Sequence, residues 1–211
     1  MEDQFAENRE ERFLPIVTIV LVGVNVMLFF LCKVFGNAIY STGMLYPSAV
    51  LQGHRFYQLF SSMFLHAGIG HLVNNMLLLA VGGELVERTI GPYRYLSLYL
   101  LSGLAGNIAY LCYEMLRRES IPSLGASGAI FGLLGALLIL VVLNKGRFQG
   151  ISLRRMLFML AYSFISGTVN PNVNQLAHIG GFLAGALLMG VMQVKNLSQE
   201  ANPYDHWGNT D

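Results

Sequence analysis

The sequence predicts an all-α membrane protein, built as a bundle of six transmembrane helices. Hydrophobic residues make up 54% of its 211 residues and charged residues only 12%, which is about half the charged share of a soluble domain. Several long stretches contain no Asp, Glu, Lys or Arg, and their lengths approach the roughly 20 residues that a helix needs to cross a bilayer. Composition and charge-free runs therefore favour membrane-embedded helices over a soluble fold.

The charge-free stretches define six expected spans. The stretch 156–194 is too long for one crossing, and the segment 168–175, which places Pro171 among polar turn formers, divides it in two. No small-x-small cleavage pattern follows the first span, which favours a retained helix over a signal peptide. The expected spans are 14–32, 69–83, 95–113, 127–144, 152–166 and 176–194. A membrane domain over 14–195 would then lie between polar tails over 1–13 and 196–211.

The distribution of Lys and Arg predicts the orientation of these spans. An even number of crossings puts both termini on one side. If that side is the cytoplasm, the inside loops and tails carry Arg9, Arg12, Arg88, Arg94, Lys145, Arg147, Arg154, Arg155 and Lys195, and the outside loops carry Lys33, Arg55, Arg117 and Arg118. The positive-inside rule favours this arrangement, so we expect a multi-pass protein of the cell membrane with cytoplasmic termini.

Several classes of function find no support in the composition. A net charge of +1 gives no signal for nucleic-acid binding. Cys32 and Cys112 form no spaced framework, so a disulfide scaffold or a cysteine-based metal site is not expected. His66, His71 and His178 lack neighbouring carboxylates and the His-Glu-x-x-His pattern. We therefore predict no metal and no cofactor.

Two reactive residue types lie at the starts of membrane-length spans. Ser127 begins the span 127–144 within Gly-Ala-Ser-Gly, and His178 lies near the start of the last span. In the six-span arrangement both spans run from outside to inside, as does the second span, which carries His71 and Asn75 in its outer half. Polar residues are rarely placed in such surroundings without a use. Their common depth is the strongest inference that topology allows.

These residues suit acyl-transfer chemistry. A serine hydroxyl becomes nucleophilic when a base accepts its proton, and His178 titrates in the right range for that role. The start of a helix offers free N–H groups to a developing oxyanion. His71 and Asn75 are spaced i,i+4, so both project from one helix face and are candidate side-chain donors. Ser127 and His178 are therefore the candidate catalytic pair, with His71 and Asn75 as a candidate oxyanion hole.

No acidic third member is available for this pair. The aspartates are Asp3, Asp205 and Asp211, all in the tails, and Glu84 and Glu87 fall at the inner end of their span. A Ser–His dyad is the economical interpretation, and Phe131, four residues after Ser127, is a candidate for packing against the imidazole. Alone, the small-residue motif would instead indicate helix packing, and a membrane histidine a hydrogen-bonding partner.

The residues taken as a set resemble the rhomboid family of intramembrane serine proteases over about 14–194. The matching positions are Gly125, Ser127 and Gly128 of the nucleophile motif, His178 with Gly181 and Gly185 on the last helix, His71 and Asn75 on the second, His66 just before it, and Gly83 with Glu87 at its end. Two positions differ from the family pattern. The usual Trp-Arg of the first loop is His54-Arg55 here, and a frequent tyrosine on the fourth helix is Phe131.

The resemblance implies a six-helix bundle with a cavity that opens outward and an active site capped by the 168–175 connection. The segment 36–58 resembles the family's first loop, which lies partly in the outer leaflet. The implied activity is cleavage of transmembrane proteins near the outer face of the lipid bilayer. The alternative is an inactive rhomboid-like protein that binds membrane clients in quality control, although such relatives typically lack the serine or the histidine. A transporter would predict inverted repeats, which the sequence does not show.

Overall fold

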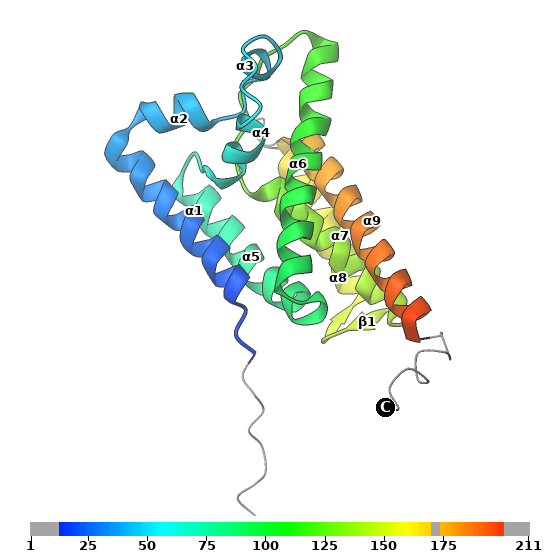
Figure 1. Ribbon diagram of the computed structural model, residues 1–211. Helices are drawn as coiled ribbons and strands as arrows, with labels where there is room; N and C mark the ends of the chain where they lie inside the picture. Colours follow the sequence, from blue (N-terminus) through cyan, green and yellow to red (C-terminus); the bar gives the residue numbers. More distant parts are fainter. Residues whose placement is uncertain (1–12, 170–173, 201–211) are drawn as a thin grey trace, which may run out of the picture.

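A computed structural model describes residues 13–169 and 174–200 as a helical bundle with short helices at one end and a small hairpin at the other (Figure 1). Its elements are α1 (Ile16–Phe35), α2 (Asn37–Gly43), α3 (Pro47–Leu51), α4 (Gln58–Ser61), the 3-10 helix η1 (Ser62–Phe64), α5 (Ile69–Ile90), α6 (Pro92–Arg117), α7 (Ser127–Leu143), β1 (Arg147–Phe148), β2 (Ile151–Ser152), α8 (Leu153–Val169) and α9 (Gln175–Glu200). The prediction of an all-α membrane protein is confirmed, apart from the antiparallel β1–β2 pair, which the sequence did not predict.

Each expected span coincides with one of the long helices, α1 and α5 to α9. Four of them, α1, α5, α6 and α9, are long and apolar enough to cross a membrane, and α7 is a shorter apolar helix of 17 residues. α8 also has 17 residues, about the lower limit for a crossing. The protein is therefore a multi-pass membrane protein, and a full set of six crossings stays a prediction.

The helix boundaries differ from the expected ones mainly where helices continue past charged residues. α5 runs on to Ile90 and so includes Glu84, Glu87 and Arg88. α9 continues to Glu200, into the expected polar tail over 196–211. Neither extension contains a proline, so backbone hydrogen bonding can continue beyond the apolar stretch. Residues 1–12, 170–173 and 201–211, which include most of both tails and the centre of the 168–175 connection, lie outside the described residues.

The core of the bundle is α7, which packs against α5, α6 and α9 (Figure 1). After Ser127 it contains only Gly, Ala, Ile, Leu, Val and Phe, and most of these side chains are buried. A helix that is apolar all round belongs in the interior of a bundle. Ser127, the first residue of α7, therefore begins a helix that is surrounded by α5, α6 and α9.

Glycines allow α7 and α9 to approach each other closely. A Cβ atom built at Gly181 would overlap the carbonyl group of Gly128, and one built at Gly185 would overlap that of Gly132. Gly135 of α7 faces the backbone of α9 in the same way. Membrane helices lack a hydrophobic driving force for association, so close backbone packing between small residues is a main source of their attraction.

A buried carboxylate fixes the start of α1 against the end of α5. Glu87, which is 1% exposed, accepts hydrogen bonds from the N–H groups of Val17 (3.0 Å) and Thr18 (2.9 Å) and from the hydroxyl of Thr18 (2.7 Å). The first N–H groups of a helix have no partner within the helix, and the helix dipole favours a negative charge beside them. Glu87 thus satisfies two of these groups where a bilayer interface would offer only water.

The segment between α1 and α5 is compact rather than extended. Gln58 is fully buried, accepts a hydrogen bond from the N–H of Tyr46 and donates one to the carbonyl of Thr42. Leu45 forms a two-way backbone bridge with Ser123, just before α7. The expected first loop over 36–58 therefore contains α2 and α3 and is tied to the segment that leads into Ser127.

Close packing of α7 and α9 predicts that alanine substitutions at two glycines of α9 differ in their effect on stability. We expect Gly185→Ala to lower the free energy of unfolding by about 1–3 kcal/mol, because the added methyl overlaps backbone atoms that cannot move aside easily. Gly190→Ala is the matched control, since nothing lies within 4 Å of its Cβ position. Equal stability of the two variants in detergent unfolding would contradict the close contact.

The two glutamates near the end of α5 are expected to differ in how much each contributes to the stability of the protein. Glu87→Gln replaces one acceptor with a donor opposite the N–H groups of α1, so we expect a loss of about 2 kcal/mol, in the range of hydrogen bonds to charged groups. Glu84 instead pairs with Arg88 in an exposed i,i+4 salt bridge, and Glu84→Gln should change stability by less than about 0.5 kcal/mol. Chemical unfolding of both variants in the same detergent provides the comparison.

Candidate active site

The candidate residues lie at the starts of three helices that begin at the same end of the bundle (Figure 1). Ser127 is the first residue of α7, His71 lies in the first turn of α5, and His178 lies in the first turn of α9. Residues more than fifty positions apart in sequence therefore lie at the same end of the bundle. The α2–η1 segment covers the same end, and the β1–β2 hairpin lies at the opposite end.

Ser127 and His178 are in hydrogen-bonding contact. Ser127 Oγ lies 2.8 Å from His178 Nε2, and His178 is 6% exposed. At this distance the imidazole can accept the hydroxyl proton directly if its Nε2 is unprotonated. The close packing of α7 and α9 just below this contact sets the distance.

The imidazole of His178 is held by ring packing. The Phe131 ring stacks on it with centroids 4.1 Å apart and planes 7° apart, and Phe164 of α8 packs edge-on against Phe131 at 5.1 Å. Within the described residues, His178 Nδ1 has no hydrogen-bond partner. The ring is thus oriented by an aromatic face, where a triad would use a carboxylate.

Asn174 holds the start of α9 and was missed in the sequence analysis. Its side-chain oxygen accepts a hydrogen bond from the N–H of Ala177 (3.0 Å), the arrangement of a helix N-cap. Its side-chain nitrogen donates to Ser123 Oγ at 2.8 Å. An Asn immediately before an apolar helix was the available signal. This residue links the helix of His178 to the segment that precedes Ser127.

His71 lies over Gly125, two residues before Ser127. Gly125 has φ +133°, a conformation that side chains other than glycine rarely adopt. A Cβ atom there would lie 2.8 Å from His71 Cε1 and 3.0 Å from Nε2. The bare backbone at Gly125 therefore leaves room for the imidazole of His71 beside the serine motif.

His66, in the connection between η1 and α5, supports His71. The two rings meet edge to face with centroids 5.1 Å apart, and His66 is fully buried. Burial, with a smaller contribution from His71, lowers the pKa of His66 to about 4. The ring is therefore neutral at pH 7 and acts on His71 through packing rather than charge.

Asn75 provides a buried donor on the same face of α5 as His71. It is 3% exposed, and its amide nitrogen has no hydrogen-bond partner among the described residues. Its amide nitrogen can therefore donate to an acceptor placed beside this face of α5.

A second group of polar residues, which the sequence analysis also did not identify, fixes the backbone before Ser127. Asn107 of α6 donates to the carbonyl of Leu59 (2.7 Å) and to Ser62 Oγ (3.1 Å), and the carbonyl of Ser62 accepts from the N–H of Gly125 (2.9 Å). One polar residue within an apolar helix gave too weak a signal to assign these partners. The chain of contacts connects α6, η1 and the serine motif.

Comparison with known proteins identifies the family. The Rhomboid domain family model matches residues 53–195, more than half of the chain. The chain belongs to the rhomboid family. Its rhomboid domain begins in the first loop and includes the helices that carry all of the candidate site residues.

Individual rhomboid relatives agree with this assignment. The chain is 32% identical to the rhomboid protease GluP of Bacillus subtilis over 81% of its own length and 34% of that protein, and 32% identical to the putative rhomboid protease YdcA of Bacillus subtilis over 84% and 88%. It is 41% identical to RHOMBOID-like protein 2 of Arabidopsis thaliana over 69% and 45%. The chain therefore spans less than half the length of GluP and of RHOMBOID-like protein 2.

Among the described residues, no group of three or more His, Cys, Asp or Glu side chains is placed to hold a metal ion.

Proposed function

We propose that this rhomboid protein is an intramembrane serine endopeptidase with Ser127 as nucleophile and His178 as general base. The observation that carries the proposal is the 2.8 Å contact between Ser127 Oγ and His178 Nε2, with Phe131 stacked on the imidazole. Of the relatives, GluP is named as a rhomboid protease and YdcA as a putative rhomboid protease.

In the proposed reaction, His178 Nε2 takes the hydroxyl proton as Ser127 Oγ attacks the substrate carbonyl. The proton then passes to the leaving amine, and a water molecule activated by the same imidazole hydrolyses the acyl-enzyme. The negative oxygen of each tetrahedral intermediate is stabilised by the N–H of Ser127 and the side chains of His71 and Asn75. A single donor of this kind is commonly worth about 3 kcal/mol.

The proposed substrates are transmembrane segments of other membrane proteins. The candidate site lies at the ends of α5, α7 and α9, so a substrate peptide bond would be reached near one face of the bilayer rather than at its centre. Backbone groups in a membrane helix are satisfied internally. A substrate segment must therefore unwind before its carbonyl can enter the oxyanion site.

The proposed location is the cell membrane, with cleavage near the outer face. The distribution of arginines between the two ends of the bundle supports this orientation. Arg147 lies in β1, and Arg154 and Arg155 lie in the first turn of α8, at the end of the bundle opposite the candidate site. The positive-inside rule favours a cytoplasmic location for this end. The beginning of α1 lies at the same end (Figure 1), in keeping with a cytoplasmic N-terminus.

A fluorophosphonate probe tests the dyad directly. We expect the purified protein to be labelled on Ser127, and labelling to be lost in Ser127→Ala and in His178→Ala, because attack on the probe needs both nucleophile and base. Ser97→Ala is the matched control, since Ser97 is exposed and its hydroxyl donates to the carbonyl of Tyr93 in its own helix. Labelling that persists in Ser127→Ala would overturn the proposal. A folded wild-type protein that takes no label would favour the inactive, client-binding alternative.

Ring packing at Phe131 predicts a graded effect on the same reaction. Phe131→Ala removes the surface that orients His178, so we expect the rate of probe labelling to fall about 10- to 100-fold. Phe131→Tyr keeps the ring and should retain most of the wild-type rate. Because both variants keep Ser127 and His178, equal rates for all three proteins would show that stacking does not position the imidazole.

A further inference from the structure

An apolar pocket of about 590 Å³ lies between α1, α6 and the α2–η1 segment, on the side of the bundle away from α9. Leu21, Val24 and Leu28 line it from α1, and their i, i+3, i+7 spacing gives one continuous face. Leu96 and Leu100, one turn apart, line it from α6. The walls are almost wholly hydrocarbon, and the pocket takes no part in the candidate active site.

The depth of the pocket limits what can fill it. Leu21 to Leu28 is the middle of α1, a helix long and apolar enough to cross the membrane, so the pocket lies level with the hydrocarbon core. A cavity holds water only where several polar groups can bind it, and this one offers few. Its volume is in the range of small-molecule binding sites. The molecule that surrounds the protein at this depth is lipid.

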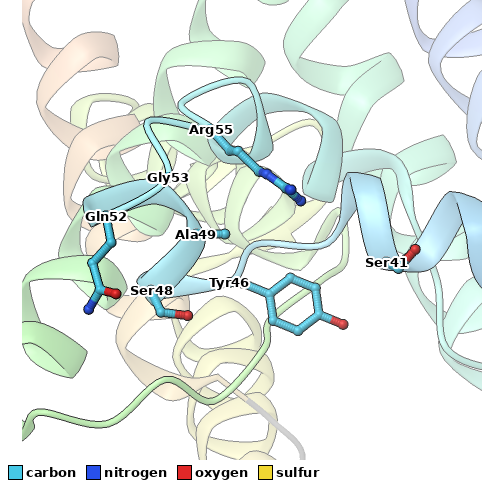
Figure 2. A pocket seen from close by; sticks show the side chains of 7 residues that line it. All are labelled: Ser41, Tyr46, Ser48, Ala49, Gln52, Gly53 and Arg55. Carbon is cyan, nitrogen blue, oxygen red and sulfur yellow. The ribbon is translucent and has the colours of Figure 1, made fainter.

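We propose that the acyl chain of a bilayer phospholipid occupies this pocket as a bound, structural lipid. Helix α2 forms a wall of the apolar pocket and also borders a second pocket of about 510 Å³, whose lining includes Ser41, Tyr46 and Arg55 (Figure 2). Arg55 makes no ion pair with the described residues. The stretch 13–83 carries Lys33 and Arg55 as its formal charges and no Asp or Glu. This charge suits a lipid with a phosphate group better than a neutral or cationic amphiphile.

The bound chain would support the segment that carries His66. Phe64 and Leu65 line the pocket and directly precede His66, whose carbonyl accepts a hydrogen bond from the Tyr40 hydroxyl at 2.7 Å. The ring of His66 in turn packs against His71. An acyl chain against Phe64 and Leu65 therefore fills the space behind this series of contacts, as a core side chain would in a soluble protein.

Photo-crosslinking in a defined bilayer tests the proposal. The protein is reconstituted into vesicles of phosphatidylglycerol and phosphatidylcholine that contain a phospholipid with a diazirine in the middle of one acyl chain, and labelled residues are mapped by mass spectrometry. We expect label on Val24, Leu28 and Leu96. In Leu100→Trp the indole projects into the pocket and obstructs it, so these positions should lose label. Leu101→Trp is the matched control, since Leu101 is 49% exposed and does not line the pocket, and it should be labelled as the wild type is.

Two results would overturn the proposal. One is pocket labelling no stronger than that of exposed membrane-facing residues such as Leu183 and Leu187 on α9. The other is wild-type labelling of the pocket in a Leu100→Trp protein that elutes as a single folded species. If Leu100→Trp does not fold, Val24→Phe on the opposite wall decides in the same way, with labelling measured at Leu28 and Leu96. Because the measurement reports lipid capture, its result does not depend on whether the chain cleaves peptide bonds.

Discussion

The close approach of α7 and α9 is the constraint on which the candidate site depends. A Cβ atom at Gly181 or Gly185 of α9 would overlap the backbone of Gly128 or Gly132 of α7. This packing brings Ser127 Oγ within 2.8 Å of His178 Nε2. A wider separation would leave a hydroxyl and an imidazole in an apolar setting without a partner, which is costly. The glycines therefore affect both the stability of the bundle and the geometry of the candidate site.

Around this contact, polar groups hold the backbone and an aromatic ring packs against the imidazole of His178. The carbonyl of Ser62 accepts from the N–H of Gly125, Asn107 donates to the hydroxyl of Ser62, and Asn174 caps the first turn of α9. Phe131 then orients the imidazole without adding a charge. A buried carboxylate at this position would need its own compensating partners, and a stacked ring needs none. The buried carboxylate Glu87 is used instead far from the site, where helix α1 supplies the compensating N–H groups.

The sequence predicted much of the architecture because the bilayer imposes simple rules on it. Charge-free runs located the starts of α1 and α5 to α9 to within three residues, and the family resemblance is confirmed by the match over 53–195. The predictions failed where polar or short segments were involved. α2, α3 and the β1–β2 hairpin carry no membrane-length signal, and α9 continues into its polar tail because backbone hydrogen bonds do not require apolar side chains.

By itself the sequence determined the residue types of the candidate site and the helix on which each one lies. The alternation of spans was enough to expect Ser127, His178, His71 and Asn75 at one depth, since each helix reverses direction across the bilayer. Only the tertiary structure decided which groups touch: the stack of Phe131 on His178, the ring of His71 over Gly125, and the polar contacts from Asn107 and Asn174. Depth follows from counting residues along one chain. Contact depends on the distance and rotation between helices, which is set by packing between residues far apart in sequence.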